Sequence, residues 1–245
     1  SKMQYAIRIR CIFFKVIFRK GTLTSHNRCA IMGAISETEM RGKNMQLPIT
    51  SHTLETERLL LRAWNTGDLE DFFAYASEPG VGERAGWKHH QSLEESQRIL
   101  DAFIAEQEVF AVVLKTENRA IGSLGVHPSW ASELPDFAAP TGGPPRVKEI
   151  GYVISRAYWG RGLIPEAVRA VIEYAFEVLG LEALTVGHFP ENKQSKRVIE
   201  KCGFTYFGTG VFHAVQLGRE IPELRYMLRR SDWLKRRQAN YIVTE

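Results

Sequence analysis

A strand, a glycine turn and a long helix follow one another over residues 147–176 and constrain the fold more than any other stretch. Large apolar side chains occupy every second position over Glu149–Ile154, which is the period-two pattern of a β-strand. From Pro165 onward the apolar positions recur at helical spacing instead. Gly160 and Gly162 lie between the two patterns and predict a tight turn. We therefore expect a strand that leads through this turn into the N-terminus of a long helix.

The turn has the composition of an anion-binding site. Its backbone N–H groups, at residues 160–164, lie just before or at a helix N-terminus, where unpaired donors and the helix dipole attract phosphate. A dinucleotide-binding fingerprint needs a third glycine where Pro165 stands, and a P-loop needs a Gly-Lys-Ser/Thr sequence that is absent. Two interpretations stay open at this point: a phosphate loop of another kind, and a plain turn that uses glycine for its backbone conformation.

Positive charge is concentrated at the N-terminus. Residues 1–46 hold nine of the 32 Lys and Arg residues but only two of the 28 acidic residues, so the basic character of the chain comes from this stretch. It is therefore no argument that the remainder binds nucleic acid. The apolar run in this stretch is short and broken by Lys15, so no membrane span is expected. We expect a poorly ordered or dispensable extension over 1–46, with a targeting segment or a membrane-surface patch as the alternatives.

Cysteine and histidine usage gives no sign of a disulfide framework or a metal site. Cys11, Cys29 and Cys202 are odd in number and lack CxxC spacing, which favours a reducing, cytoplasmic setting. The histidines, His127 among them, have no metal-ligand spacing and are expected at the surface or in the core. We therefore expect no metal.

The rest of the chain alternates between strand and helix patterns. Strands are expected at 54–62, 109–115, 120–126, 149–154, 183–188, 204–211 and 221–228, and helices at 68–77, 92–106, 165–179 and 192–201. Residues 127–146 hold five prolines and are expected to form a loop that either lines a pocket or is a solvated excursion. This order predicts an α/β (α+β) domain over 47–230, with helices flanking a mixed, mostly antiparallel sheet, and a basic tail over 231–245.

Several motifs occur in the order in which one enzyme family carries them. They are Thr56-Glu57-Arg58-Leu59-Leu60-Leu61-Arg62, Ile121-Gly122-Ser123-Leu124-Gly125, Glu149-Ile150-Gly151-Tyr152, the turn Trp159–Ile164, and Asn192–Phe204. Together, over about residues 54–228, they resemble the RimJ/RimL-like branch of the GNAT N-acetyltransferases. The turn resembles the pyrophosphate loop Gln/Arg-x-x-Gly-x-Gly/Ala of that family, with Trp159 and Ile164 departing at its first and sixth positions. The resemblance implies a GNAT fold, acetyl-CoA as donor and an amine as acceptor.

The resemblance also implies roles for individual residues. Glu149 is implied as the base that deprotonates the amine, directly or through water, and Ser195 as the acid that protonates the CoA thiolate. The alternatives are a strand-end carboxylate paired with Arg or Lys, and a serine bonded to its own helix backbone. Tyr152 would reach the pocket from the strand, although an aromatic residue at such a position more often belongs to the core. Implied contacts with acetyl-CoA are made by Val153, Ile154, Trp159, Gly160, Arg161, Gly162, Leu163, Ile164, Asn192 and Ser195.

The function predicted on this basis is direct transfer of acetyl from acetyl-CoA to a primary amine. The branch that the chain resembles favours a protein N-terminal α-amine as acceptor. The alternatives are a small amine such as an antibiotic or a polyamine, and a non-catalytic CoA-binding module on the same fold. No nucleic-acid partner is expected, and monomer and homodimer both stay open.

Overall fold

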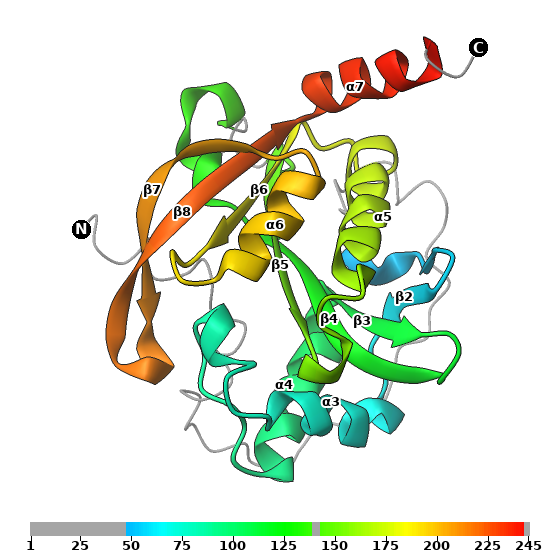
Figure 1. Ribbon diagram of the computed structural model, residues 1–245, viewed down its shortest axis with the longest axis vertical. Helices are drawn as coiled ribbons and strands as arrows, with labels where there is room; N and C mark the ends of the chain where they lie inside the picture. Colours follow the sequence, from blue (N-terminus) through cyan, green and yellow to red (C-terminus); the bar gives the residue numbers. More distant parts are fainter. Residues whose placement is uncertain (1–47, 139–142, 243–245) are drawn as a thin grey trace, which may run out of the picture.

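The computed structural model describes residues 48–138 and 143–242, and within them the strands form one mixed sheet. The strand order is β1-β2-β3-β4-β5-β6-β8-β7, and every neighbouring pair is antiparallel except β5 and β6 (Figure 1). This confirms the predicted mixed, mostly antiparallel sheet. The bounds are β1 Leu54–Glu55, β2 Leu59–Ala63, β3 Val109–Leu114, β4 Arg119–Pro128, β5 Val147–Ile154, β6 Ala183–His188, β7 Thr205–Ala214 and β8 Arg219–Arg229.

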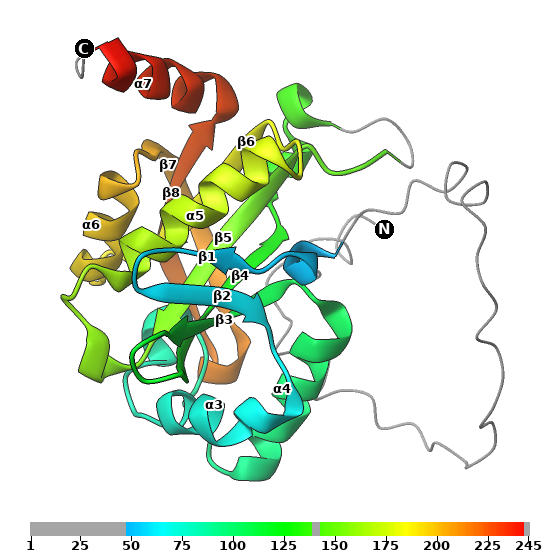
Figure 2. The same cartoon turned by 90° about the vertical axis from the view of Figure 1, so that its right-hand side faces the viewer.

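Helices cover both faces of the sheet (Figures 1 and 2). Helices α3 (Leu69–Ala76) and α4 (Leu93–Glu106) pack their apolar side chains against one face of the sheet. Helices α5 (Leu163–Glu177) and α6 (Lys193–Lys201) pack theirs against the opposite face. The central strand β3 is buried along its whole length and alternates between the two cores. Burial on both faces explains why its sequence is a continuous apolar run.

The predicted first strand, 54–62, is wrong in one respect, because a turn divides it into β1 and β2, which pair with each other. The side chain of Glu166 on α5 holds this turn. It accepts hydrogen bonds from Thr56 Oγ1 at 2.6 Å, from the Arg58 backbone N–H at 2.9 Å and from Arg58 Nε at 2.7 Å. A carboxylate from a distant helix thus satisfies the Arg58 backbone N–H within the turn, and the two side-chain donors tie the turn to α5.

The basic residues after β8 form a further helix, α7 (Arg230–Ile242), which the sequence patterns did not predict. It packs on the end of α5, where Trp233 lies 5.4 Å from Phe176 between ring centroids. Arg237 pairs with Glu173 and Glu177 of α5, so ion pairs stabilise a helix that has only a weak apolar face.

The segment expected as a loop over 127–146 contains regular elements among its described residues. Strand β4 continues to Pro128, and short 3-10 turns follow at Trp130–Glu133 and Pro135–Phe137. The extension over 1–46 lies outside the described residues, as do residues 139–142.

Candidate active site

The sheet splits between its two parallel strands. Strands β5 and β6 pair only from Val147–Ala183 to Glu149–Thr185, and beyond this point residues 150–154 have register partners on β4 alone. Backbone N–H and C=O groups on such an edge require a partner, so an extended ligand can take the place of the missing strand. A cavity of about 830 Å³ lies at this split, lined by β5, β6, α6 and the N-terminus of α5.

The glycine turn forms one end of the cavity. Gly160 and Gly162 both have φ of 76°, a left-handed conformation that favours glycine, and α5 begins at the next residue, Leu163. Arg58 Nη1 donates to the Arg161 carbonyl at 3.0 Å, and Trp159 Nε1 donates to the Ile154 carbonyl at 2.9 Å. The turn is therefore tied to the β1–β2 turn and to the end of β5, with the first N–H groups of α5 at the cavity.

Ile164 does not fill the mouth of the turn. Its side chain is only 6% exposed and belongs to the core beneath α5, although part of it also lines the cavity. The departure from a small residue at this position is therefore accommodated by packing.

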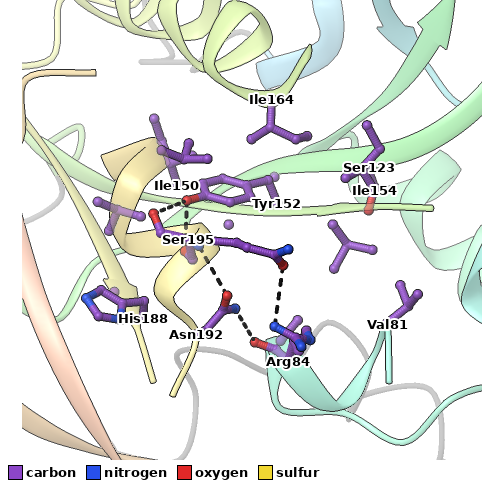
Figure 3. Close-up of a pocket in the computed structure, with 18 of the residues that line it drawn as sticks. Val81, Arg84, Ser123, Ile150, Tyr152, Ile154, Ile164, His188, Asn192 and Ser195 are labelled. Carbon is purple, nitrogen blue, oxygen red and sulfur yellow. Dashed lines mark hydrogen bonds between the residues drawn. The ribbon is translucent and has the colours of Figure 1, made fainter. Parts of the chain in front are cut away.

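The start of α6 brings three polar groups together (Figure 3). Asn192 Oδ1 accepts from the Ser195 N–H at 3.1 Å and caps the helix, while its Nδ2 donates to the Arg84 carbonyl at 3.3 Å. Ser195 Oγ lies 2.9 Å from the Tyr152 hydroxyl, which reaches it from β5. The serine hydroxyl thus faces a second hydroxyl inside the cavity instead of its own helix backbone.

Tyr152 combines the two places considered from the sequence, because it packs against the core and also lines the cavity. Burial raises the pKa of its phenol, and the hydrogen bond to Ser195 opposes that effect only in part. The hydroxyl therefore stays protonated at neutral pH and can donate to Ser195 Oγ. The period-two pattern predicts only the side of β5 on which Tyr152 lies. It cannot predict the Ser195 hydroxyl as its partner, because that hydroxyl belongs to a helix that begins about forty residues later.

Arg84 is a site residue that the sequence analysis missed. It belongs to the short 3-10 turn Glu83–Ala85, and its guanidinium lies 5.0 Å from the ring centroid of Trp159. Its Nη1 also donates to Gln194 Oε1 at 3.4 Å (Figure 3). A cation from the α3–α4 connection thus lies between the turn and α6, at the end of the cavity where an anion would bind.

Several carboxylates also line the cavity. Glu149 is only 2% exposed and lines the cavity where β5 and β6 separate. Glu106, Glu108 and Glu223 line it as well, together with the aromatic rings of Trp87, Phe103 and Phe212. Burial works to raise the pKa of Glu108, yet His127 and Lys148 outweigh it and hold that pKa below the usual value of 4.5.

The structure brings nearly all predicted site residues to one cavity. Glu149, Val153, Ile154, Trp159, Gly160, Gly162, Leu163, Ile164, Asn192 and Ser195 line it. The exception is Arg161, whose exposed side chain lies over the Tyr158 ring at 5.1 Å from its centroid. Within residues 48–138 and 143–242, no three His, Cys, Asp or Glu side chains are arranged to hold a metal ion. No helix in the same ranges is long and apolar enough to cross a membrane.

Comparison with known proteins agrees with this geometry. Residues 58–205 match the acetyltransferase (GNAT) domain family. The uncharacterized N-acetyltransferase YoaA of Bacillus subtilis is 31% identical over 156 residues, which cover 62% of this chain and 81% of YoaA.

Two solved structures have the same fold. A ribosomal-protein alanine acetyltransferase from Vibrio fischeri matches with a TM-score of 0.58 and 21% identity, over 75% of this chain and 99% of that one. A spermidine N-acetyltransferase from Vibrio cholerae, in complex with CoA and spermine, matches with a TM-score of 0.58 and 20% identity, over 73% and 99%. With this fold, and with a family match that spans the split sheet and the glycine turn, the chain belongs to the GNAT family of N-acetyltransferases.

Proposed function

We propose that this protein transfers acetyl from acetyl-CoA to a primary amine by direct attack of the amine on the thioester. The observation that carries the proposal is the placement of two kinds of group at one cavity. A buried carboxylate, Glu149, lies where the strands separate, and a hydroxyl pair, Ser195 and Tyr152, reaches the same cavity from α6 and β5. Amine acetylation needs a group that takes a proton from nitrogen and one that gives a proton to sulfur.

The cofactor end of the cavity fits acetyl-CoA. The free edge of β5 at residues 150–154 offers backbone groups to the amides of pantetheine, as a neighbouring strand would. The N–H groups of the turn at residues 160–164 suit the pyrophosphate, and Arg84 adds positive charge nearby. Asn192 keeps the start of α6, and with it Ser195, beside this edge.

The protein's own groups account for the proton transfers. Glu149 draws the proton from the ammonium form of the acceptor, directly or through water. Attack by the neutral amine then breaks the carbon–sulfur bond, and Ser195 Oγ donates a proton to the departing thiolate. Tyr152, which stays protonated, lies 2.9 Å from Ser195 Oγ and 3.3 Å from the Ser195 carbonyl oxygen, and so holds Ser195 in place for that step. Each of these groups contributes on the order of 10²- to 10⁴-fold in rate when it acts as an acid or a base.

The acceptor that we propose is a protein N-terminal α-amine. The likeness of the motifs to the RimJ/RimL branch supports it, and so does the fold shared with a ribosomal-protein alanine acetyltransferase. A small polycationic amine is the second candidate. The specific observation in its favour is that Glu106, Glu108, Glu149 and Glu223 line the cavity, although Glu108 is paired with Lys148 and Glu223 with Arg225. Several carboxylates complement a ligand with several positive charges.

Acetyl transfer from acetyl-CoA to a panel of N-terminal peptides, spermidine and aminoglycosides tests the proposal. We expect the wild-type protein to acetylate at least one of these classes, and the preferred class identifies the acceptor. The variants Glu149→Gln and Ser195→Ala should bind acetyl-CoA with the wild-type Kd but should lower kcat about 100-fold or more. Binding of acetyl-CoA by wild type without transfer to any amine would instead favour a non-catalytic CoA-binding module.

A further inference from the structure

His127 is a titratable group in the cavity to which the steps above give no role. It lies on β4 directly opposite Glu149 on β5, and both side chains line the cavity. Directly opposed residues of an antiparallel pair point to the same face of a sheet. The imidazole, which is 22% exposed, therefore shares a face with the proposed base while keeping a route to solvent.

A pair of glycines sets the position of the His127 ring. Gly125 and Gly151 are register partners, two residues along each strand from His127 and Glu149. A Cβ atom at Gly125 would overlap His127 Nε2, and one at Gly151 would lie 3.9 Å from the same nitrogen. The ring is thus folded back over the glycine pair, in space that side chains would otherwise fill. Its Nε2 end lies over two residues that line the cavity.

The other ring nitrogen faces a carboxylate. His127 Nδ1 is buried and lies 3.8 Å from Glu108 Oε2, while Glu108 Oε1 lies 3.4 Å from Lys148 Nζ. Because the pKa of Glu108 is held below 4.5, this carboxylate is an anion at neutral pH. An anion beside Nδ1 favours the tautomer with the proton on Nδ1, which leaves Nε2 as a proton acceptor. Such contacts are often long in a ligand-free enzyme and shorten when substrate binds.

We propose that His127 is the general base that takes the proton from the acceptor ammonium, and that Glu108 is the residue that positions it. This role rests on the proposed acetyl transfer, moves the proton acceptor from Glu149 to His127, and leaves Glu149 as the carboxylate that stabilises the imidazolium from β5. The ammonium gives one proton to Nε2, which leaves a neutral amine and an imidazolium. The nitrogen–carbon bond forms and the carbon–sulfur bond breaks. Sulfur receives a proton from Ser195, the nitrogen's second proton restores the Ser195 hydroxyl, and the imidazolium releases its proton to solvent.

The charges around His127 favour this cycle. Glu108 directly precedes β3, and Glu149 faces the ring from β5, so two carboxylates stabilise the imidazolium. The one opposing cation, Lys148, is already paired with Glu108. His188 and Glu223 line the same cavity from β6 and β8.

The test is the pH dependence of kcat/KM for the best acceptor of the panel. For His127→Gln we expect an unchanged acetyl-CoA Kd, a fall in kcat of about 100-fold, and loss of the rise in rate that accompanies deprotonation of histidine. Imidazole added to His127→Ala should restore part of the rate. Glu108→Gln should lower kcat at an unchanged acetyl-CoA Kd, and Glu108→Asp, which keeps a carboxylate near Nδ1, should retain more of the rate. The control is His213→Gln, an exposed histidine that pairs with Glu220 and does not line the cavity.

Four results would contradict the role of His127. A His127→Gln variant with the wild-type rate and pH profile would overturn the role of His127 as the base. If Ser195→Ala is slow in the same assay, the proposed acetyl transfer stands. Loss of acetyl-CoA binding in His127→Gln, or no rescue of His127→Ala by imidazole, would mean that the residue is only structural. A wild-type protein that transfers acetyl to no amine would overturn the proposed function and the role of His127 with it.

Discussion

At the residue scale, the cavity is lined by a hydroxyl and an imidazole group. For both groups the sequence patterns favour a place in the core or at the surface. Tyr152 and His127 lie on neighbouring strands, and each meets a partner far away in the sequence, Ser195 for the first and Glu108 for the second. Period-two spacing predicts the side of a strand on which a residue lies. It cannot predict which loop or helix closes over that side, and this is why the sequence left Tyr152 between core and pocket and gave His127 no place in the site.

His90 gives a prediction for the pH dependence of stability. Its side chain is buried, with Nδ1 2.6 Å from Ser96 Oγ, and burial lowers its pKa to about 4 from a usual 6.5. The unfolded chain therefore binds a proton that the folded protein excludes between these pH values. The stability that this neutral histidine contributes is present above pH 6.5 and is lost as the pH falls toward 4.

Urea unfolding of wild type and His90→Gln at pH 7 and pH 5 measures this contribution. Between these pH values we expect wild type to lose about 2 kcal/mol more unfolding free energy than the variant. Equal losses in the two proteins would show that His90 does not titrate in this way.

At the element scale, most helices and strands were predictable from apolar spacing and caps. The helix after the glycine turn begins two residues before its expected start, and α4 begins after Ser92, whose hydroxyl accepts from the Glu95 N–H at 3.2 Å. The patterns failed where distant groups decide the local structure. The division of the first strand depends on Glu166, and α7 depends on its contacts with α5.

The turn held by Glu166 predicts a stability difference between two positions on α5. Glu166→Gln should lower the free energy of unfolding by about 1–3 kcal/mol, because it weakens charge-assisted bonds from Thr56 and Arg58. Glu173→Gln on the same helix affects only an exposed pair with Arg237 and should cost less than about 1 kcal/mol. Urea unfolding of both variants measures the difference, and equal costs would contradict the role of the Glu166 contacts.

The glycine turn gives a prediction with a matched control. Gly162 and Gly218 have φ of 76° and 63°, and an added Cβ would meet only Arg58 at 3.7 Å in the first case and nothing within 4 Å in the second. Alanine at either position should therefore destabilise the protein by about 1–2 kcal/mol through backbone strain alone. Only Gly162→Ala should also raise the Kd for acetyl-CoA. An equal Kd in the two variants, measured by calorimetric titration, would argue against the turn as the pyrophosphate site.

At the scale of the whole molecule, the excess of positive charge and the cavity of the proposed reaction lie in different parts of the chain. Every group used in the proposed reaction lies within residues 48–230, whereas residues 1–46 carry a large excess of basic over acidic residues. We propose that residues 47–230 form the acetyltransferase domain, with α7 docked on α5 as an accessory helix.

A chain that begins at residue 47 tests this division. We expect it to unfold at the urea concentration of the full chain and to bind acetyl-CoA with the same Kd, since no described contact of the cavity involves an earlier residue. A fragment that fails to fold or to bind acetyl-CoA would contradict the proposed domain.

The central claim is that acetyl transfer takes place in the cavity between β5 and β6, with Ser195 as the acid. Its most direct test is a mass-resolved single-turnover assay with isotopically labelled acetyl-CoA and the preferred amine, on wild type and Ser195→Ala. The account predicts a labelled acetyl group on the amine nitrogen with wild type, and transfer about 100-fold slower with Ser195→Ala at an unchanged Kd for acetyl-CoA. Equal single-turnover rates in the two proteins would contradict the account.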